Sequence, residues 1–232
     1  MSARPAAVPA PPTRERLARL LLAAFLLVAL CELVSLALGR ETGHLVAKPL
    51  LMPLLAAYTA VRGGPPLLTG ALLFGWGGDV LLMFDADGAF LAGMGFFAAG
   101  HVCYLVLFRR GRPQGLLGAV YVLILAVTVA LLWPGLPAEL RVPVAGYSLL
   151  LTAMAWRAGG LGPLAGAGGA LFLLSDTLIA AGIADWPRPP APDFWIMLSY
   201  LAAQSLLAAG SLRHGSRARA RARAYGAGRA TG

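Results

Sequence analysis

The chain has 232 residues, of which 59% are hydrophobic and 12% charged, and its formal net charge at pH 7 is +9. Soluble domains carry about a quarter charged residues, so this composition excludes a soluble globular protein and indicates a polytopic membrane protein. The charges fall between apolar runs, mostly as arginines in the tails and short loops, so we expect no nucleic-acid partner. Both cysteines lie inside apolar runs, which supports neither a disulfide framework nor a metal knuckle.

Eight apolar runs follow one another, and we expect an all-α bundle of eight transmembrane helices. The runs are 17–38, 45–61, 67–84, 89–108, 115–133, 141–156, 163–183 and 194–212. Several are shorter than the ~20 residues that cross a bilayer comfortably, so the pattern fixes their ends only to within a few positions. The predicted membrane domain is thus 17–212. Residues 1–16 and the Arg-Ala-rich residues 213–232 have no apolar period, and we expect both to be disordered.

Arginines and acidic residues divide between alternate loops. If the N-terminus is cytoplasmic, the inside segments hold fifteen arginines and the outside loops three, Arg40, Arg141 and Arg188. The acidic residues of the loops all fall outside: Glu41, Asp85, Asp87, Glu139, Asp185 and Asp193. This bias follows the positive-inside rule and requires an even number of spans, so we expect a multi-pass plasma-membrane protein with both termini cytoplasmic. The tail arginines either contact anionic lipid or form a solvated end that only reinforces this orientation.

Two intramembrane aspartates carry the functional prediction. Asp79 lies in GALLFGWGGDVLLMF (70–84), and Asp176 lies in the similar segment GALFLLSDTLI (169–179). A carboxylate inside hydrocarbon costs roughly 2.5–3.5 kcal/mol on insertion scales, so it is rarely retained without a role. The two aspartates are 97 residues apart, and the first and fifth spans start about 98 residues apart. We therefore expect a 4+4 repeat with both aspartates where the halves meet.

Other polar residues inside the spans fall at comparable depths. Glu32, Asp79 and Asp176 each lie five to seven residues from the outer end of an outward-running span, roughly 8–10 Å below the outer edge. On the inward-running spans, Lys48 and Tyr200 lie at similar or shallower depth, and His101 and Gln204 lie somewhat deeper. Tyr104 shares a helix face with His101. We expect a polar chamber in the outer half of the bundle, with Glu32 as a partner of Lys48. For His101, a role as a hydrogen-bonded packing residue is an equal alternative.

The residue types favour acid–base chemistry over metal chemistry. Of the three histidines, His44 and His214 lie in a predicted loop and in the tail, which excludes a three-histidine zinc site. A carboxylate-only site would favour a hard cation such as magnesium. Burial and mutual repulsion favour the neutral form of a carboxyl group, so one aspartate can carry a proton while the other is ionised. Such a pair supplies a general acid and a general base, and we expect no metal and no cofactor.

These residues also form a series of short motifs. They are Lys48-Pro49, Gly78-Asp79-x-x-Leu82, Gly100-His101-x-x-Tyr104, Ser175-Asp176-x-Leu178 and Tyr200-x-x-x-Gln204. In order and spacing they resemble the YhhN family of lysoplasmalogenases, from about Lys48 to Leu207. The resemblance implies an eight-helix hydrolase that cleaves the vinyl-ether bond of lysoplasmalogens. The products would be a fatty aldehyde and glycerophosphoethanolamine or glycerophosphocholine.

The family's two catalytic aspartates map onto Asp79 and Asp176. We assign Asp176 as the acid and Asp79 as the base, an order that the sequence itself does not fix. We expect Lys48 to hold the substrate phosphate. The remaining residues would orient the carboxylates or water: His101, Tyr104, Tyr200 and Gln204.

Two other classes of protein fit a buried carboxylate pair. A proton-coupled transporter or lipid flippase would use the same aspartates to carry protons, and broken helices in matching positions of both halves would favour it. A structural membrane protein would hold them in a polar network without a ligand. The sequence leaves the physiological lipid and the oligomeric state open.

Overall fold

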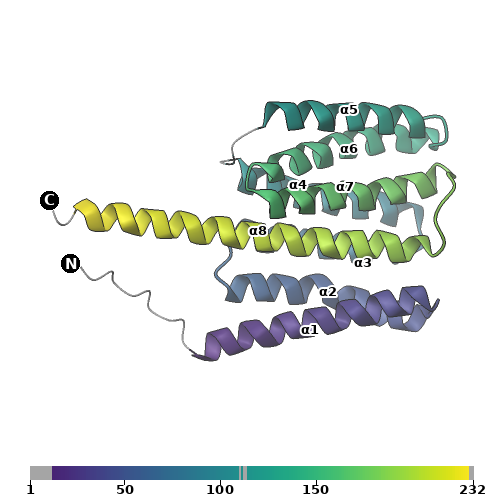
Figure 1. Cartoon of the computed structure of the whole chain (residues 1–232). Helices are drawn as coiled ribbons and strands as arrows, with labels where there is room; N and C mark the ends of the chain where they lie inside the picture. The colour runs from purple at the N-terminus through teal and green to yellow at the C-terminus, as the bar shows by residue number, and fades with distance from the viewer. Residues whose placement is uncertain (1–11, 110, 112–113, 230–232) are drawn as a thin grey trace.

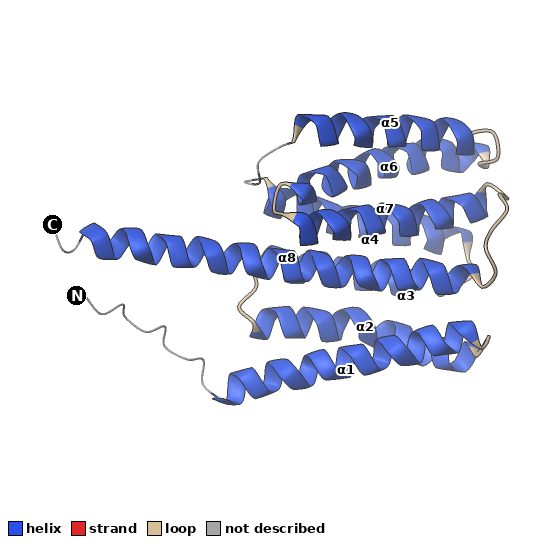
Figure 2. Cartoon of the chain, in the orientation of Figure 1, coloured by secondary structure: helices blue, strands red, loops and turns tan. Residues whose placement is uncertain are grey.

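The computed structural model describes residues 12–109, 111 and 114–229, which fold into eight helices without a strand (Figures 1 and 2). The helices are α1 Pro12–Ala37, α2 Glu41–Val61, α3 Pro66–Leu81, α4 Asp87–Phe108, α5 Gly115–Leu132, α6 Ala138–Gly159, α7 Pro163–Ile183 and α8 Pro192–Arg229. Each predicted span falls on one helix, which confirms the all-α polytopic bundle. Six of these described helices are long and apolar enough to cross a membrane. The exceptions are α3, with 16 residues, and α6, which carries Glu139, Arg141 and Arg157.

Neighbours in sequence are neighbours in space along most of the bundle (Figure 1). In the first half α1 packs on α2, α2 on α3 and α3 on α4, and the second half repeats this order from α5 to α8. The halves meet where α4 packs on α6 and where α8 contacts α1, α2 and α3. The start of α1 and the end of α8 lie at the same end of the bundle. This arrangement is compatible with the predicted 4+4 repeat, which stays a prediction.

A glycine sets the spacing between α7 and α8. A Cβ atom added at Gly168 of α7 would lie 2.8 Å from the backbone nitrogen of Leu207 and 2.9 Å from the carbonyl oxygen of Ala203, both on α8. Small residues at such contacts let membrane helices approach closely enough for their backbones to pack. The contact holds α7, which carries Asp176, directly against α8, which carries Tyr200.

Two prolines lie inside α2, yet the helix is continuous from Glu41 to Val61. Pro53 has no N–H, so it cannot bond the carbonyl group of Pro49 one turn earlier. The indole Nε1 of Trp76, on α3, donates a hydrogen bond to that carbonyl oxygen at 2.9 Å. Trp76 therefore ties α3, three residues before Asp79, to the turn of α2 that carries Lys48. α6, which holds Pro143, is also continuous.

The predicted disorder of both tails needs correction. α1 starts at Pro12, so residues 12–16 are helical, whereas residues 1–11 lie outside the described part. α8 continues to Arg229, so residues 213–229 are helical too, and residues 230–232 lie outside the described part. Arginine and alanine are both good helix formers, and a helix that already exists extends without a new nucleus. In Figure 1 the last turns of α8 project beyond the ends of the other helices.

Candidate functional site

Asp79 lies at one end of a hydrogen-bonded chain that crosses three helices. Its carboxyl group, on α3, is buried, and the hydroxyl of Tyr200 on α8 donates to its Oδ2 at 2.8 Å. One turn along α8, Nε2 of Gln204 donates to the Tyr200 oxygen at 3.3 Å. The hydroxyl of Tyr104, on α4, donates to Oε1 of Gln204 at 2.6 Å. The structure thus joins four of the predicted site residues in one network.

A glycine on α3 leaves the space that this network occupies. A Cβ atom added at Gly75 would lie 3.1 Å from Nε2 of Gln204 and 3.1 Å from the Tyr200 hydroxyl. Gly75 is one helical turn before Asp79, so it faces the same neighbours. Gly75 therefore packs against side chains of α8.

Asp176 belongs to a second hydrogen-bonded chain, which runs through α7, α6 and α4. The hydroxyl of Tyr147, on α6, donates to Oδ2 of Asp176 on α7, and its oxygen lies 3.0 Å from Nε2 of His101 on α4. Because the tyrosine proton is directed to the carboxyl group, His101 carries its own proton on Nε2 and donates it to Tyr147. The other ring nitrogen of His101, Nδ1, is buried and has no partner among the described residues.

An aromatic cluster connects the two chains. Phe172 of α7 lies edge-on between His101 and Tyr200, with ring centroids 4.7 Å and 5.4 Å away. Phe97 of α4 makes an edge-to-face contact with Tyr200 at 6.0 Å. Asp79 and Asp176 lie close enough for their charges to interact. The two aspartates therefore share one buried region, although each has its own tyrosine.

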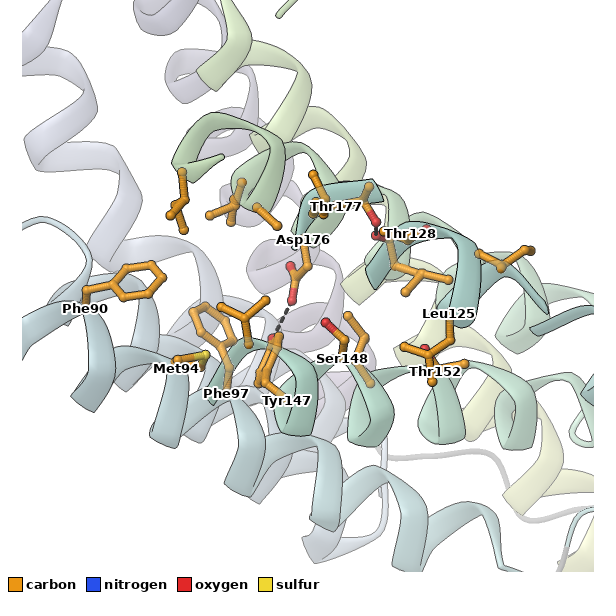
Figure 3. A pocket seen from close by; sticks show the side chains of 18 of the residues that line it. Phe90, Met94, Phe97, Leu125, Thr128, Tyr147, Ser148, Thr152, Asp176 and Thr177 are labelled. Atoms are coloured by element: carbon orange, nitrogen blue, oxygen red, sulfur yellow. Dashed lines mark hydrogen bonds between the residues drawn. The ribbon is translucent and has the colours of Figure 1, made fainter. Parts of the chain in front are cut away.

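A cavity of about 740 Å³, its open mouth included, lies between α4, α5, α6 and α7 (Figure 3). Asp176 and Tyr147 lie on its wall. Three residues of α4 form an apolar side: Phe90, Met94 and Phe97. Three hydroxyl-bearing residues of α5 and α6 lie on another side, among apolar residues of the same helices such as Leu125 and Leu151: Thr128, Ser148 and Thr152. Only about 70 Å³ of this space is open to a water-sized molecule, and the mixed lining suits an amphipathic group.

The cavity differs from the predicted polar chamber. Of the seven predicted site residues, all of which the structure describes, Asp176 alone lines it. The other six lie outside its lining, and Asp79, His101, Tyr104, Tyr200 and Gln204 are each at most 4% exposed. Phe97 lines the cavity and also fills the space over Gly78, next to Asp79. The polar residues thus form a closed network behind one wall of the cavity rather than its lining.

Glu32 has a different partner from the predicted one. Its buried Oε1 lies 2.7 Å from Nδ1 of His44, and its Oε2 is buried without a partner among the described residues. α2 begins at Glu41, so His44 lies in the first helical turn instead of in a loop. Lys48, one turn further on, forms no ion pair with a described residue, but it lies within electrostatic range of Glu32 and Asp79.

Within the described ranges, no three histidine, cysteine, aspartate or glutamate side chains lie close enough together to hold a metal ion. The aspartates instead have tyrosine hydroxyls as direct partners. This arrangement holds two carboxyl groups in different surroundings. Asp176 faces a cavity, and Asp79 is enclosed.

Tyr147 is the main site residue that the sequence analysis missed. A tyrosine within an apolar span gives no signal of its own, because it is as easily a packing residue. The internal similarity could have found it, since Tyr147 follows Lys48 by 99 residues, as Tyr200 follows His101 by 99. Asp79 thus has Lys48 and Tyr200 nearby, whereas Asp176 has Tyr147 and, through it, His101.

Comparison with known proteins adds family information to this geometry. The model of the YhhN family matches residues 43–211. The chain is 37% identical to human lysoplasmalogenase TMEM86B over 151 residues, which are 65% of this chain and 66% of that protein. It is 39% identical to the Sus scrofa protein of the same name over 158 residues, 68% of each. The Rattus norvegicus protein is 34% identical over 168 residues, 72% of this chain and 71% of the relative. The match thus spans about two thirds of each relative's length, and no solved structure matches significantly.

Proposed function

The chain belongs to the YhhN family, and from this premise we propose that it is a membrane hydrolase that cleaves the vinyl-ether bond of lysoplasmalogens. The products are a fatty aldehyde and glycerophosphoethanolamine or glycerophosphocholine. Relatives named lysoplasmalogenase support this activity. The observation that carries the proposal is the pair of tyrosine-bonded aspartates, one of which lies on the wall of an amphipathic cavity.

Hydrolysis begins with proton transfer to carbon. Asp176, in its neutral form, gives its proton to the vinyl carbon remote from the ether oxygen. Its Oδ2 accepts the bond from Tyr147, so Oδ1 carries the proton that is transferred. The double bond breaks as the new C–H bond forms, and the positive charge is shared by the adjacent carbon and the ether oxygen. A positioned acid of this kind typically contributes 10²–10⁴-fold to a rate.

Water completes the reaction. It adds to the positively charged carbon and loses a proton, giving a hemiacetal, which then splits into the aldehyde and the free glycerol hydroxyl. The proton of the water passes to Asp176, which lines the cavity and became a carboxylate in the first step. The ionised Asp79 lies behind Phe97 and Gly78 rather than on the cavity wall, so it acts by stabilising the positive charge.

The remaining polar residues position these two groups. Tyr200, held by Gln204 and Tyr104, fixes the carboxyl group of Asp79. His101 fixes the hydroxyl of Tyr147. Lys48 lies within electrostatic range of Asp79, where its positive charge balances the carboxylate, and because it does not line the cavity we no longer assign it to the substrate phosphate.

The test is aldehyde release by purified protein in detergent. We expect aldehyde from ethanolamine or choline lysoplasmalogens, also in the presence of EDTA, and none from the saturated 1-O-alkyl lysolipid, which has no vinyl bond to protonate. Wild-type protein that releases no aldehyde from either lysoplasmalogen would overturn the proposal. Proton movement into liposomes by such inactive protein would favour the transporter instead.

A further inference from the structure

The hydroxyl side of the cavity contains groups that lack hydrogen-bond partners. Thr152 of α6 is 4% exposed, lines the cavity, and has no partner for its buried Oγ1 among the described residues. Ser148 lies one turn earlier on the same face of α6, and Thr128 faces them from α5 (Figure 3). No hydrogen bond from either of these two hydroxyls is found within the described structure either.

Other hydroxyls of the bundle behave differently. A serine or threonine inside a helix ordinarily bonds the carbonyl group one turn back. Thr177, on the same cavity wall, does so, with its Oγ1 2.7 Å from the carbonyl oxygen of Leu173. Ser199 and Ser211 do the same on α8. A buried hydroxyl that lacks this bond and lines a cavity can form a hydrogen bond with a ligand there. Such a bond is favoured because unpaired buried polar groups are unfavourable.

The hydroxyls lie on the opposite side of Asp176 from the apolar wall. In Figure 3, Asp176 and Tyr147 lie between the side chains of Phe90 and Met94 and the group that contains Ser148 and Thr152. A ligand held across this cavity therefore places its hydrocarbon part toward α4 and its neutral polar part toward α5 and α6. The junction of the two parts comes to lie at Asp176.

We propose that the unpaired hydroxyls of Thr152 and Ser148 recognise the free sn-2 hydroxyl of a lysolipid and thereby select lysolipids over lipids acylated at that position. This inference rests on the proposed function for the identity of the lipid class. In a lysoplasmalogen the vinyl-ether bond joins the hydrocarbon chain to glycerol, and the sn-2 hydroxyl lies one carbon further along the glycerol. With the vinyl group at Asp176, that hydroxyl reaches the side of the cavity that Thr152 and Ser148 form.

A hydroxyl group is the right partner for neutral side-chain hydroxyls, because each can donate and accept one bond. A site built to bond a hydroxyl discriminates against an analogue that lacks it, since the protein groups are then left unpaired. An acyl group at the same position removes the donor and adds bulk in a confined space. The arrangement thus makes Thr152 and Ser148 specificity-determining residues rather than catalytic ones.

The experiment is a competition between two ligands that cannot react. An equimolar mixture of a saturated 1-O-alkyl lysolipid and its 2-deoxy analogue is added to the full-length protein in detergent, and native mass spectrometry gives the ratio of the two complexes. We expect wild type to favour the lysolipid about 10-fold, the usual worth of a hydrogen bond in a dry site. Thr152→Val, which keeps the shape and removes the hydroxyl, should bring the ratio close to one.

Two variants serve as controls. Thr152→Ser keeps a hydroxyl and should keep the preference. Thr177→Val removes a hydroxyl from the same cavity, but one already bonded to Leu173, and should also keep it. A wild-type ratio near one, binding of neither lipid, or an unchanged ratio in Thr152→Val would each overturn the inference. Wild type that prefers the lysolipid but releases no aldehyde from lysoplasmalogen would uphold it and refute the proposed hydrolysis.

Discussion

Replacing each aspartate by asparagine separates catalysis from folding. Asparagine has nearly the size of aspartate and keeps an oxygen that can accept the bonds from Tyr147 and Tyr200. It has neither a proton to transfer to carbon nor a charge to stabilise the cation. We therefore expect Asp79→Asn and Asp176→Asn to insert and fold normally and to lose activity.

The size of the loss follows from these roles. A single proton-transfer group contributes at least ~100-fold, which corresponds to about 2.7 kcal/mol of activation free energy. Each single variant should fall by that factor in aldehyde release at saturating lysoplasmalogen. Because both aspartates act on one cationic intermediate, the double variant should be little worse than the worse single one.

The assay needs a control for charge removal alone. Asp85→Asn makes the same chemical change at an exposed position outside the described helices and should leave the rate unchanged. Thermal unfolding in detergent checks that all variants fold. A folded Asp79→Asn/Asp176→Asn double variant that keeps more than about a tenth of the wild-type rate would refute the two-carboxylate mechanism.

Three further predictions address the second network, the packing and the topology. Tyr147→Phe removes the donor to Asp176 and should lower kcat/KM about 10-fold in the aldehyde assay, and an unchanged value would show that this bond plays no part in catalysis. Gly168→Ala places a Cβ against the α8 backbone and should lower the free energy of unfolding by about 1–3 kcal/mol. In the control Gly146→Ala, the added Cβ meets no atom within 4 Å, so this variant should not be destabilised. Equal stability of the two variants would contradict the packing argument. A reporter fused after Arg213 should mark the cytoplasm and one inserted beside Asp85 the outside, and the reverse pattern would contradict the arginine-based orientation.

Hydropathy and depth could predict much of the architecture and part of the Asp79 network. The apolar runs locate every helix, because only backbone-satisfied helices are stable in hydrocarbon without a barrel. Tyr200 and Gln204 are four residues apart, which places them on one helix face, and in the structure they bond each other. Their common depth with Asp79 then suggests the contact that the structure contains.

The Asp176 network could not be predicted in the same way. The apolar residues of α6 are spread around its axis, so hydropathy does not fix the rotation of this helix and cannot say that Tyr147 faces α7. The cavity also depends on how α4 to α7 pack, which no single segment encodes. The pairing of Glu32 with His44 was missed for a simpler reason: four residues at the start of α2 were assigned to a loop.

The length of α8 decides where the arginine repeat can act. α8 has 38 residues, and at 1.5 Å per residue it is about 57 Å long, nearly twice the ~30 Å of hydrocarbon in a bilayer. The 17 residues after the predicted span, 213–229, therefore extend about 25 Å as a rod along the bundle axis (Figure 1). A membrane surface potential decays within a Debye length of about 8 Å at physiological salt. We therefore expect any attraction to anionic lipid to be confined to the first turn or two after Leu212, with the rest of the repeat beyond its range.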